Sequence, residues 1–239
     1  WAISLFRENV YYEIHDYPRS YKWLYRGLFK RVKKIISTNQ IKKDRLIKEF
    51  NVDQNKIVVH RNGVDVESFR PFESKHESKR NGTIAYEVTQ YNKKYISYIG
   101  KYKTFGQSKG VEELIKAFAQ LRQQRDDIFL MLVGINSDEK DEVKEIFKKN
   151  NLQWNIDCRI QEDDVPHGLM FEYFHSSDVL VMNYPNTEHY AQFMSPLKMF
   201  EYMASGTPIV ATDLPSIREV LNESNAVLVE PGNPESLKN

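Results

Sequence analysis

Apolar residues along the chain follow two spacings, one typical of buried strands and one of amphipathic helices. Residues 128–133 are all apolar, which predicts a strand covered on both faces. Val111, Leu114, Ile115 and Phe118 lie at helical spacing. Strands are predicted over 10–15, 34–38, 57–60, 95–99, 128–133, 156–160, 178–182, 209–211 and 226–229, and helices over 18–32, 41–50, 111–121, 138–149, 168–174 and 195–205. This alternation indicates an α/β fold with doubly wound parallel sheets.

The pattern fails in one place, and that break suggests the domain organisation. Residues 71–82 are charged and lack apolar periodicity. We therefore expect a first domain over 1–70, a linker over 71–91 and a second domain over 92–239. The chain starts at Trp1 and stops at Asn239, where a further helix is expected, so we expect a piece of a longer protein.

In parallel sheets, ligands bind at the carboxyl ends of the strands. Gly100, Gly134 and Asn183 follow predicted strands and are therefore expected to mark the edge of a site. Segment 195–215 adds a helix that begins at this kind of edge. Ser195 is predicted to cap that helix, Pro196 to occupy its first position, and Gly206 to end it.

Segment 195–215 also closely resembles the donor-sugar segment of the family-4 glycosyltransferases (glycosyl transferases group 1), which have the GT-B fold. Segments 57–71, 98–112 and 178–181 resemble other parts of that family in the same order. Together they cover most of residues 10–230. The resemblance implies two Rossmann-like domains facing each other across a cleft, the first incomplete because its opening glycine-rich loop would precede Trp1.

The resemblance further implies a retaining, metal-independent hexosyltransferase. It would move a sugar from a nucleoside-diphosphate donor to the hydroxyl of a carbohydrate or lipid-linked acceptor. The expected setting is the synthesis of surface polysaccharide, lipopolysaccharide or glycolipid. No cofactor is implied beyond the nucleotide-sugar co-substrate.

Several site residues are carried over from the family's motifs. Lys101 and Lys109 would neutralise the donor diphosphate and stabilise the leaving group, although the family often has Arg where this chain has Lys101. Glu201 would accept hydrogen bonds from the ribose hydroxyls. The remaining donor-binding residues would be Gly100, Ser195, Pro196, Leu197 and Lys198. The alternative without a ligand is that Lys101 and Lys109 are solvated loop residues and that Lys198 and Glu201 form an ion pair on the helix surface. A cation at Lys198 opposes the helix dipole, which favours an anion there.

His15 is expected at the end of the first strand, where the family carries a histidine facing donor sugar and acceptor. A neutral imidazole there would orient or deprotonate an acceptor hydroxyl. A purely structural histidine is the alternative. Glu13 is assigned to the opposite face of the strand, as a structural partner.

One residue departs from the family pattern. The family commonly has an acid seven residues before Glu201, and here that position is Phe193. Sugar contacts would then come from Ser195, from the backbone N–H groups of Met194 and Leu197, or from Glu188 or His189. This leaves the identity of the donor sugar open.

Residues 19–34 hold seven Lys or Arg and no acid. The apolar stripe of this predicted helix comprises Tyr21, Leu24, Leu28 and Val32, which leaves a basic, aromatic face. Such a face suits peripheral contact with an anionic membrane, and a solvated helix face is the alternative.

Composition excludes several classes of function. With 34 basic and 33 acidic residues, a general nucleic-acid binder is not expected. The single Cys158 cannot form an intramolecular disulfide and is expected as a buried strand thiol. The acid pairs at 126–127 and 163–164 lack His or Cys partners, so no metal site is expected. No apolar run is long enough to span a bilayer, and we expect a cytoplasmic protein, peripheral on the membrane at most.

Two other functions remain open from the sequence. A nucleotide-sugar isomerase or epimerase on the same fold would consume its substrate without an acceptor. A non-catalytic binding subunit, which Phe193 favours, would tolerate the loss of both Lys101 and Glu201.

Overall fold

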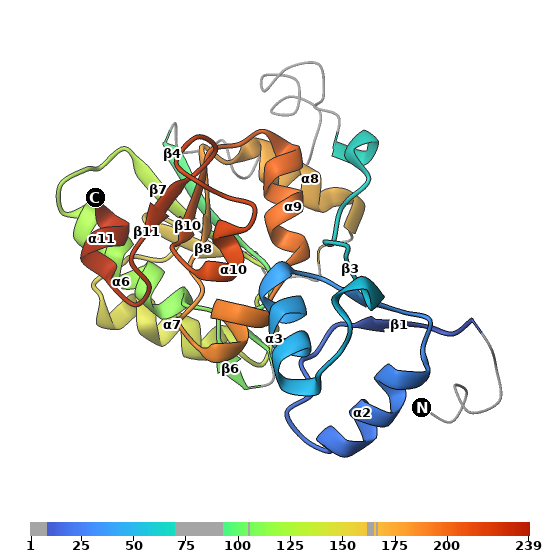
Figure 1. Cartoon of the computed structure of the whole chain (residues 1–239). Helices are drawn as coiled ribbons and strands as arrows, with labels where there is room; N and C mark the ends of the chain where they lie inside the picture. Colours follow the sequence, from blue (N-terminus) through green and yellow to red (C-terminus); the bar gives the residue numbers. More distant parts are fainter. Residues whose placement is uncertain (1–8, 70–92, 105, 162–164, 166) are drawn as a thin grey trace. The chain divides into compact units, whose positions relative to one another are not determined.

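The computed structural model describes residues 9–69, 93–104, 106–161, 165 and 167–239, so the expected linker over 71–91 lies outside the described residues. The chain divides into two compact units (Figure 1). The first unit comprises Trp1–Gly63 together with Thr187–Pro196 and Leu214–Val220, and the second comprises the remaining residues. Two segments from the last quarter of the sequence therefore belong to the same unit as the N-terminal sheet.

The first unit is built on a parallel sheet in the order β1-β2-β3, formed by β1 (Tyr11–Ile14), β2 (Lys34–Ser37) and β3 (Ile57–Val59). Its helices are α2 (Lys22–Arg31), α3 (Gln40–Phe50) and the short η1 (Gln54–Lys56). Buried Ile14, Leu28, Phe29, Leu46 and Phe50 form its apolar core, which confirms the predicted alternation of strand and helix.

The two late segments complete this first unit. A π-helical turn, η4 (His189–Phe193), packs against α3 and against α10 (Pro215–Arg218). Asn39 caps α3 and donates hydrogen bonds to the carbonyls of Gln192 and Met194, both at 3.0 Å. The carboxylate of Glu219 accepts hydrogen bonds from two N–H groups in the first turn of α3, both at 2.9 Å. These bonds satisfy amides that a helix N-terminus otherwise leaves without partners.

The second unit contains a parallel sheet of six strands in the order β11-β10-β9-β4-β7-β8. The strands are β4 (Lys94–Ile99), β7 (Ile128–Val133), β8 (Cys158–Ile160), β9 (Val179–Met182), β10 (Ile209–Thr212) and β11 (Val227–Val229). Every residue of β7 is buried, as its apolar run predicts. The α/β fold with doubly wound parallel sheets is therefore confirmed.

Helices connect these parallel strands. They are α6 (Val111–Arg122), α7 (Lys140–Lys149), α8 (His167–Ser176) and α9 (Leu197–Ser205). The short η2 (Val66–Phe69) precedes the sheet, and α11 (Pro234–Lys238) follows its last strand, β11. A small antiparallel hairpin, β5 (Lys103–Thr104) with β6 (Gln107–Ser108), was not expected from the sequence. Within the described ranges, no helix combines the length and apolar character that crossing a membrane requires.

Two local predictions were wrong. Helix α9 begins at Leu197, and the hydroxyl of Ser195 makes no hydrogen bond to any described residue, so Ser195 does not cap it. Ser195 instead accepts a hydrogen bond from Asn62 through its carbonyl oxygen. The second wrong prediction is the assignment of Tyr21 to the apolar stripe of α2. Tyr21 is 72% exposed, because the chain enters this helix through a left-handed turn at Tyr21 (φ 51°), and Phe29 is buried in the core instead.

Candidate functional site

The carboxyl edge of the second sheet carries a glycine that allows a lysine to approach. Gly100 follows β4 with a φ of +144°, and a Cβ atom there would lie 2.6 Å from Cε of Lys198. A side chain at position 100 would therefore displace the lysine. The backbone of Gly134, which follows β7, lies beside Gly100, as expected for neighbouring strand ends.

A second close approach fixes the start of α6 at the same edge. Gly110 precedes α6 with a φ of +80°, and a Cβ atom there would lie 1.7 Å from the carbonyl oxygen of Asn183. The side-chain amide of Asn183 donates a 2.9 Å hydrogen bond to the carbonyl oxygen of Gly110. The structure thus brings Gly100, Gly110 and Asn183 together at one edge, where parallel sheets bind ligands.

Lys198 is the most unusual residue of this edge. Its side chain is buried, and no described residue accepts a hydrogen bond from its Nζ. Nζ lies 3.6 Å from the ring centroid of Tyr98. The ring centroids of Tyr184 and Tyr202 are farther away, at 5.8 and 6.0 Å. Burial lowers the pKa of Lys198 well below its ordinary value, and the charge of Lys109 lowers it further.

The lysines predicted from the sequence lie around this buried amine. Burial lowers the pKa of Lys109, and the nearby charge of Lys101 adds to that effect. Lys101 itself is exposed, and its carbonyl oxygen accepts a 2.8 Å hydrogen bond from the hydroxyl of Tyr98. Lys109 thus disfavours the charge of Lys198, and Lys101 disfavours that of Lys109, an arrangement that a bound anion would stabilise.

Glu201 lies one turn after Lys198 on α9 and is half-buried. Its charge is close enough to Lys198 to oppose the lowering of that lysine's pKa. The next residue, Tyr202, anchors the helix, because its hydroxyl accepts a 3.0 Å hydrogen bond from the N–H of Ile99 at the end of β4. Helix α9 is thereby held with Lys198 and Glu201 at the strand edge.

The other predicted site residues are divided between the units. Leu197 begins α9 in the second unit and is 53% exposed, whereas Ser195 and Pro196 belong to the first unit. The roles assigned to these three residues stay predictions.

His15 also belongs to the first unit, just past β1. Its Nε2 lies 3.3 Å from Oε1 of Glu13, and both side chains are exposed. The assignment of Glu13 to the opposite face was therefore wrong, because residues two apart on a strand share a face. The catalytic role of His15 stays a prediction.

Phe193, at the position of the family's first acid, lies in the core of the first unit. Its ring stacks on that of Tyr17 at 4.3 Å with an interplanar angle of 5°, and the Arg45 guanidinium lies 4.9 Å from both ring centroids. Glu188, an alternative sugar contact, forms ion pairs with Arg45 at 2.8 Å and Arg19 at 3.3 Å. Phe193 thus packs in the core of this unit, and Glu188 pairs with arginines of the same unit.

Sequence reasoning missed the tyrosines around Lys198. Tyr202 follows Lys198 by four residues, which places the two on one helix face, and that spacing was a usable signal. Tyr98 and Tyr184 come from other elements, and no local pattern links them to the lysine. Elsewhere, Cys158 is buried as expected, and burial raises its pKa to about 12. No cluster of three or more potential metal ligands occurs among the residues described.

Comparison with known proteins identifies relatives of this chain. The chain is 27% identical over 212 residues to the D-inositol 3-phosphate glycosyltransferase of Paenarthrobacter aurescens, an alignment that covers 84% of this chain and 46% of that protein. The chain therefore spans about half the length of this relative.

Solved structures show the same fold. A glycosyltransferase from Rickettsia africae superposes with a TM-score of 0.73 at 21% identity, over 95% of this chain and 58% of that one. Anabaena HepE, solved in complex with UDP and glucose, superposes with a TM-score of 0.69 at 18% identity, over 97% of this chain and 60% of that one. Residues 93–239 match the family described as Glycosyl transferases group 1. Since this match covers more than half of the chain, the protein belongs to the glycosyl transferases group 1 family and has a GT-B-type fold.

Proposed function

We propose that this chain is part of a retaining glycosyltransferase whose second unit binds a nucleoside-diphosphate sugar. The observation that carries the proposal is the buried amine of Lys198, which has no hydrogen-bond acceptor among the described residues and lies beside Lys109 at the carboxyl edge of the sheet. A buried cation without an acceptor is costly, and a diphosphate supplies both the missing oxygens and the opposite charge.

The chemistry of this site follows from charge. As the bond between the sugar and the diphosphate breaks, the leaving oxygen keeps the electron pair, and Lys101, Lys109 and Lys198 stabilise the added charge. The N–H groups at the start of α6 face the same edge and favour an anion. Glu201 would accept hydrogen bonds from the ribose hydroxyls. The acceptor hydroxyl attacks the sugar and loses its proton, and His15 is proposed as the base.

Three lysines already supply the charge that a metal ion would otherwise bring, so we propose that transfer does not require a divalent metal. Uracil is the base to test first, because HepE, which has a similar fold, was solved with UDP and glucose. The acceptor is proposed to be a carbohydrate or lipid-linked sugar used in surface polysaccharide, lipopolysaccharide or glycolipid synthesis.

The test is thermal unfolding against UDP, GDP, ADP and CMP, followed by transfer from the matching nucleotide sugar with and without a chelator. Ligand at a hundred times its dissociation constant adds about 2.7 kcal/mol, which raises Tm by about 5 to 10 °C in a chain of this size. The shift should be lost in Lys109→Ala and kept in Lys116→Met, because Lys116 is an exposed partner of Glu112.

The outcomes separate the candidate functions. No shift with any nucleotide, in folded protein, would contradict the donor site and favour the non-catalytic binding subunit, to which the buried Phe193 already points. A shift without transfer to any acceptor would support the donor site and contradict the proposed transfer reaction. Consumption of the nucleotide sugar without an acceptor would favour the isomerase or epimerase.

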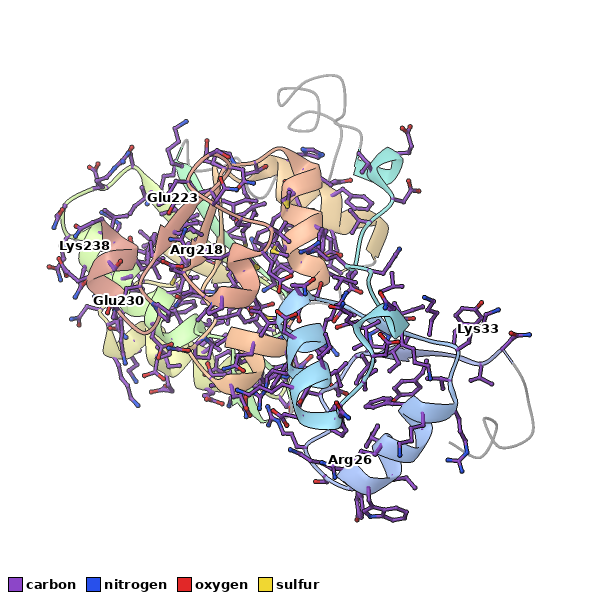
Figure 2. All side chains as sticks on the ribbon, in the orientation of Figure 1. Arg26, Lys33, Arg218, Glu223, Glu230 and Lys238 are labelled. Carbon is purple, nitrogen blue, oxygen red and sulfur yellow. The ribbon has the colours of Figure 1, made fainter. Side chains whose placement is uncertain are left out.

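We also propose that residues 19–34 contact an anionic membrane surface. Tyr21 is 72% and Trp23 69% exposed, and basic side chains including Arg26 and Lys33 lie on or just after the same helix (Figure 2). Exposed aromatic rings beside cations suit a headgroup layer. Sedimentation with anionic vesicles should be strong for the intact chain and weak for Trp23→Ala. Equal binding to neutral vesicles would contradict an electrostatic contact.

A further inference from the structure

Three aromatic rings lie close to the amine of Lys198, and no described residue accepts a hydrogen bond from it. Tyr98 comes from β4, Tyr184 from the segment after β9, and Tyr202 from α9 itself, with ring centroids 3.6, 5.8 and 6.0 Å from Nζ. We call these three residues the tyrosine cage. A ring face attracts a cation but accepts no full hydrogen bond, so the three N–H groups of an ammonium would remain unsatisfied.

We propose that Lys198 is an uncharged amine in the free protein and takes up one proton when the donor diphosphate binds. This inference rests on the proposed function, since it concerns the same site. It makes donor binding a proton-linked event rather than a simple pairing of fixed charges.

The charged groups that face Lys198 support the uncharged form. Lys109, which precedes α6, repels a positive charge there, and Lys101 in the loop after β4 adds a further cation beside Lys109. Glu201 on α9 opposes these effects. Burial raises the pKa of Tyr202 far above its ordinary value, so the tyrosine beside Lys198 on α9 contributes no negative charge.

Burial acts in the same direction as Lys109. The pKa of Lys198 lies well below its ordinary value, with burial as the main cause. The close approach to Gly100 places this amine at the carboxyl edge of the sheet, where parallel sheets bind ligands. A buried lysine that faces a ligand site, without an acceptor of its own, loses its proton more readily than a solvated one.

A bound diphosphate reverses each of these effects. Its oxygens accept hydrogen bonds from Nζ, and its negative charges outweigh those of Lys101 and Lys109. The amine then gains a proton from solvent, so that neutral Lys198, one proton and the diphosphate become an ammonium–diphosphate pair. Between the pKa of Lys198 in the free protein and its higher pKa in the complex, affinity should therefore fall by up to about tenfold for each unit rise in pH.

The test is calorimetric titration of the chain with UDP at about pH 8 in two buffers of different ionisation enthalpy. The phosphate groups of UDP are fully ionised there, because their last pKa lies near 6. The dependence of the observed heat on the buffer gives the protons taken up per UDP. We expect an uptake of about one proton per UDP for the wild-type chain. The control Lys116→Met should show the same uptake, because Lys116 is exposed and pairs with Glu112.

Two substitutions assign the proton to Lys198. Lys198→Arg stays charged at all accessible pH values, so it should bind UDP with no proton uptake. Lys198→Met should bind at least tenfold more weakly, also without uptake. UDP binding to the wild-type chain with no uptake would overturn the inference, as would uptake that persists in either variant. Failure of UDP and the other three nucleotides to bind folded protein would instead overturn the proposed function, and the inference with it.

Discussion

Tyr98 connects two lysines of the site. Its ring lies 3.6 Å from Nζ of Lys198, and its hydroxyl donates a 2.8 Å hydrogen bond to the carbonyl oxygen of Lys101. One buried strand residue thus holds the amine of one lysine and the backbone of the other. Such a residue can position binding groups without touching the ligand.

Tyr98→Phe should separate these two effects, because it keeps the ring and removes the hydroxyl. Losing one hydrogen bond to the Lys101 loop should weaken UDP binding about five- to tenfold, equivalent to about 1 kcal/mol. Calorimetry with UDP measures this. The matched control is Tyr102→Phe, which removes a hydroxyl bonded to Glu142 in the same region. Equal losses in both variants would argue against a specific positioning role for Tyr98.

Gly110 should be among the least replaceable residues of the second unit. Gly110→Ala places a Cβ atom 1.7 Å from a backbone oxygen and adds the strain of a positive φ. We therefore expect the free energy of unfolding to fall by about 3 kcal/mol or more. Gly206→Ala is the control, because Gly206 has a similar φ of +68° and a Cβ atom there would meet nothing within 4 Å. Its free energy of unfolding should fall by only about 1 kcal/mol. Urea unfolding compares them, and similar losses would show that strain alone matters.

Most of the strands could be predicted because their signals are local: an all-apolar run such as 128–133 fits only a buried strand or helix. Lys101 and Lys109 could likewise be placed between a strand and a helix, although the hairpin that separates them was not expected. The placement of 187–196 and 214–220 in the first unit could not be predicted. It depends on contacts between residues more than a hundred positions apart, such as Asn39 with Gln192 and Glu219 with Gln40.

The same long-range packing explains the unexpected phenylalanine. Phe193 lies in the core of the first unit, so restoring the family's acid there should destabilise the protein rather than improve it. Phe193→Glu should lower the free energy of unfolding by about 3 kcal/mol or more, because it buries a carboxylate and removes the stacked ring. Phe193→Leu should lose less. If Phe193→Glu instead kept its Tm and raised transfer activity, position 193 would belong to the sugar site.

Lys42 is a second buried lysine, but unlike Lys198 it has acceptors. Its Nζ donates hydrogen bonds to the carbonyls of Ile14 and His15, at 3.2 and 2.5 Å, and to the hydroxyl of Thr38 at 2.8 Å. It therefore ties the end of β1 to the residue that follows β2. Burial nevertheless lowers its pKa from 10.5 to about 8, although the charge of Asp16 opposes that shift.

This shift predicts how stability depends on pH. Between about pH 8 and 10.5 the unfolded chain holds a proton on Lys42 that the folded chain has released, so stability due to this residue rises with pH in that window. The span corresponds to about 3 kcal/mol. Urea unfolding gives the free energy of unfolding of the wild-type chain and of Lys42→Met at about pH 7 and pH 10. Relative to the variant, the wild type should be more stable at pH 10 than at pH 7. Lys48→Met, an exposed lysine on the same helix, should show no such change with pH. A constant difference for Lys42→Met would mean that its ammonium is as stable in the fold as in water, held by its three acceptors.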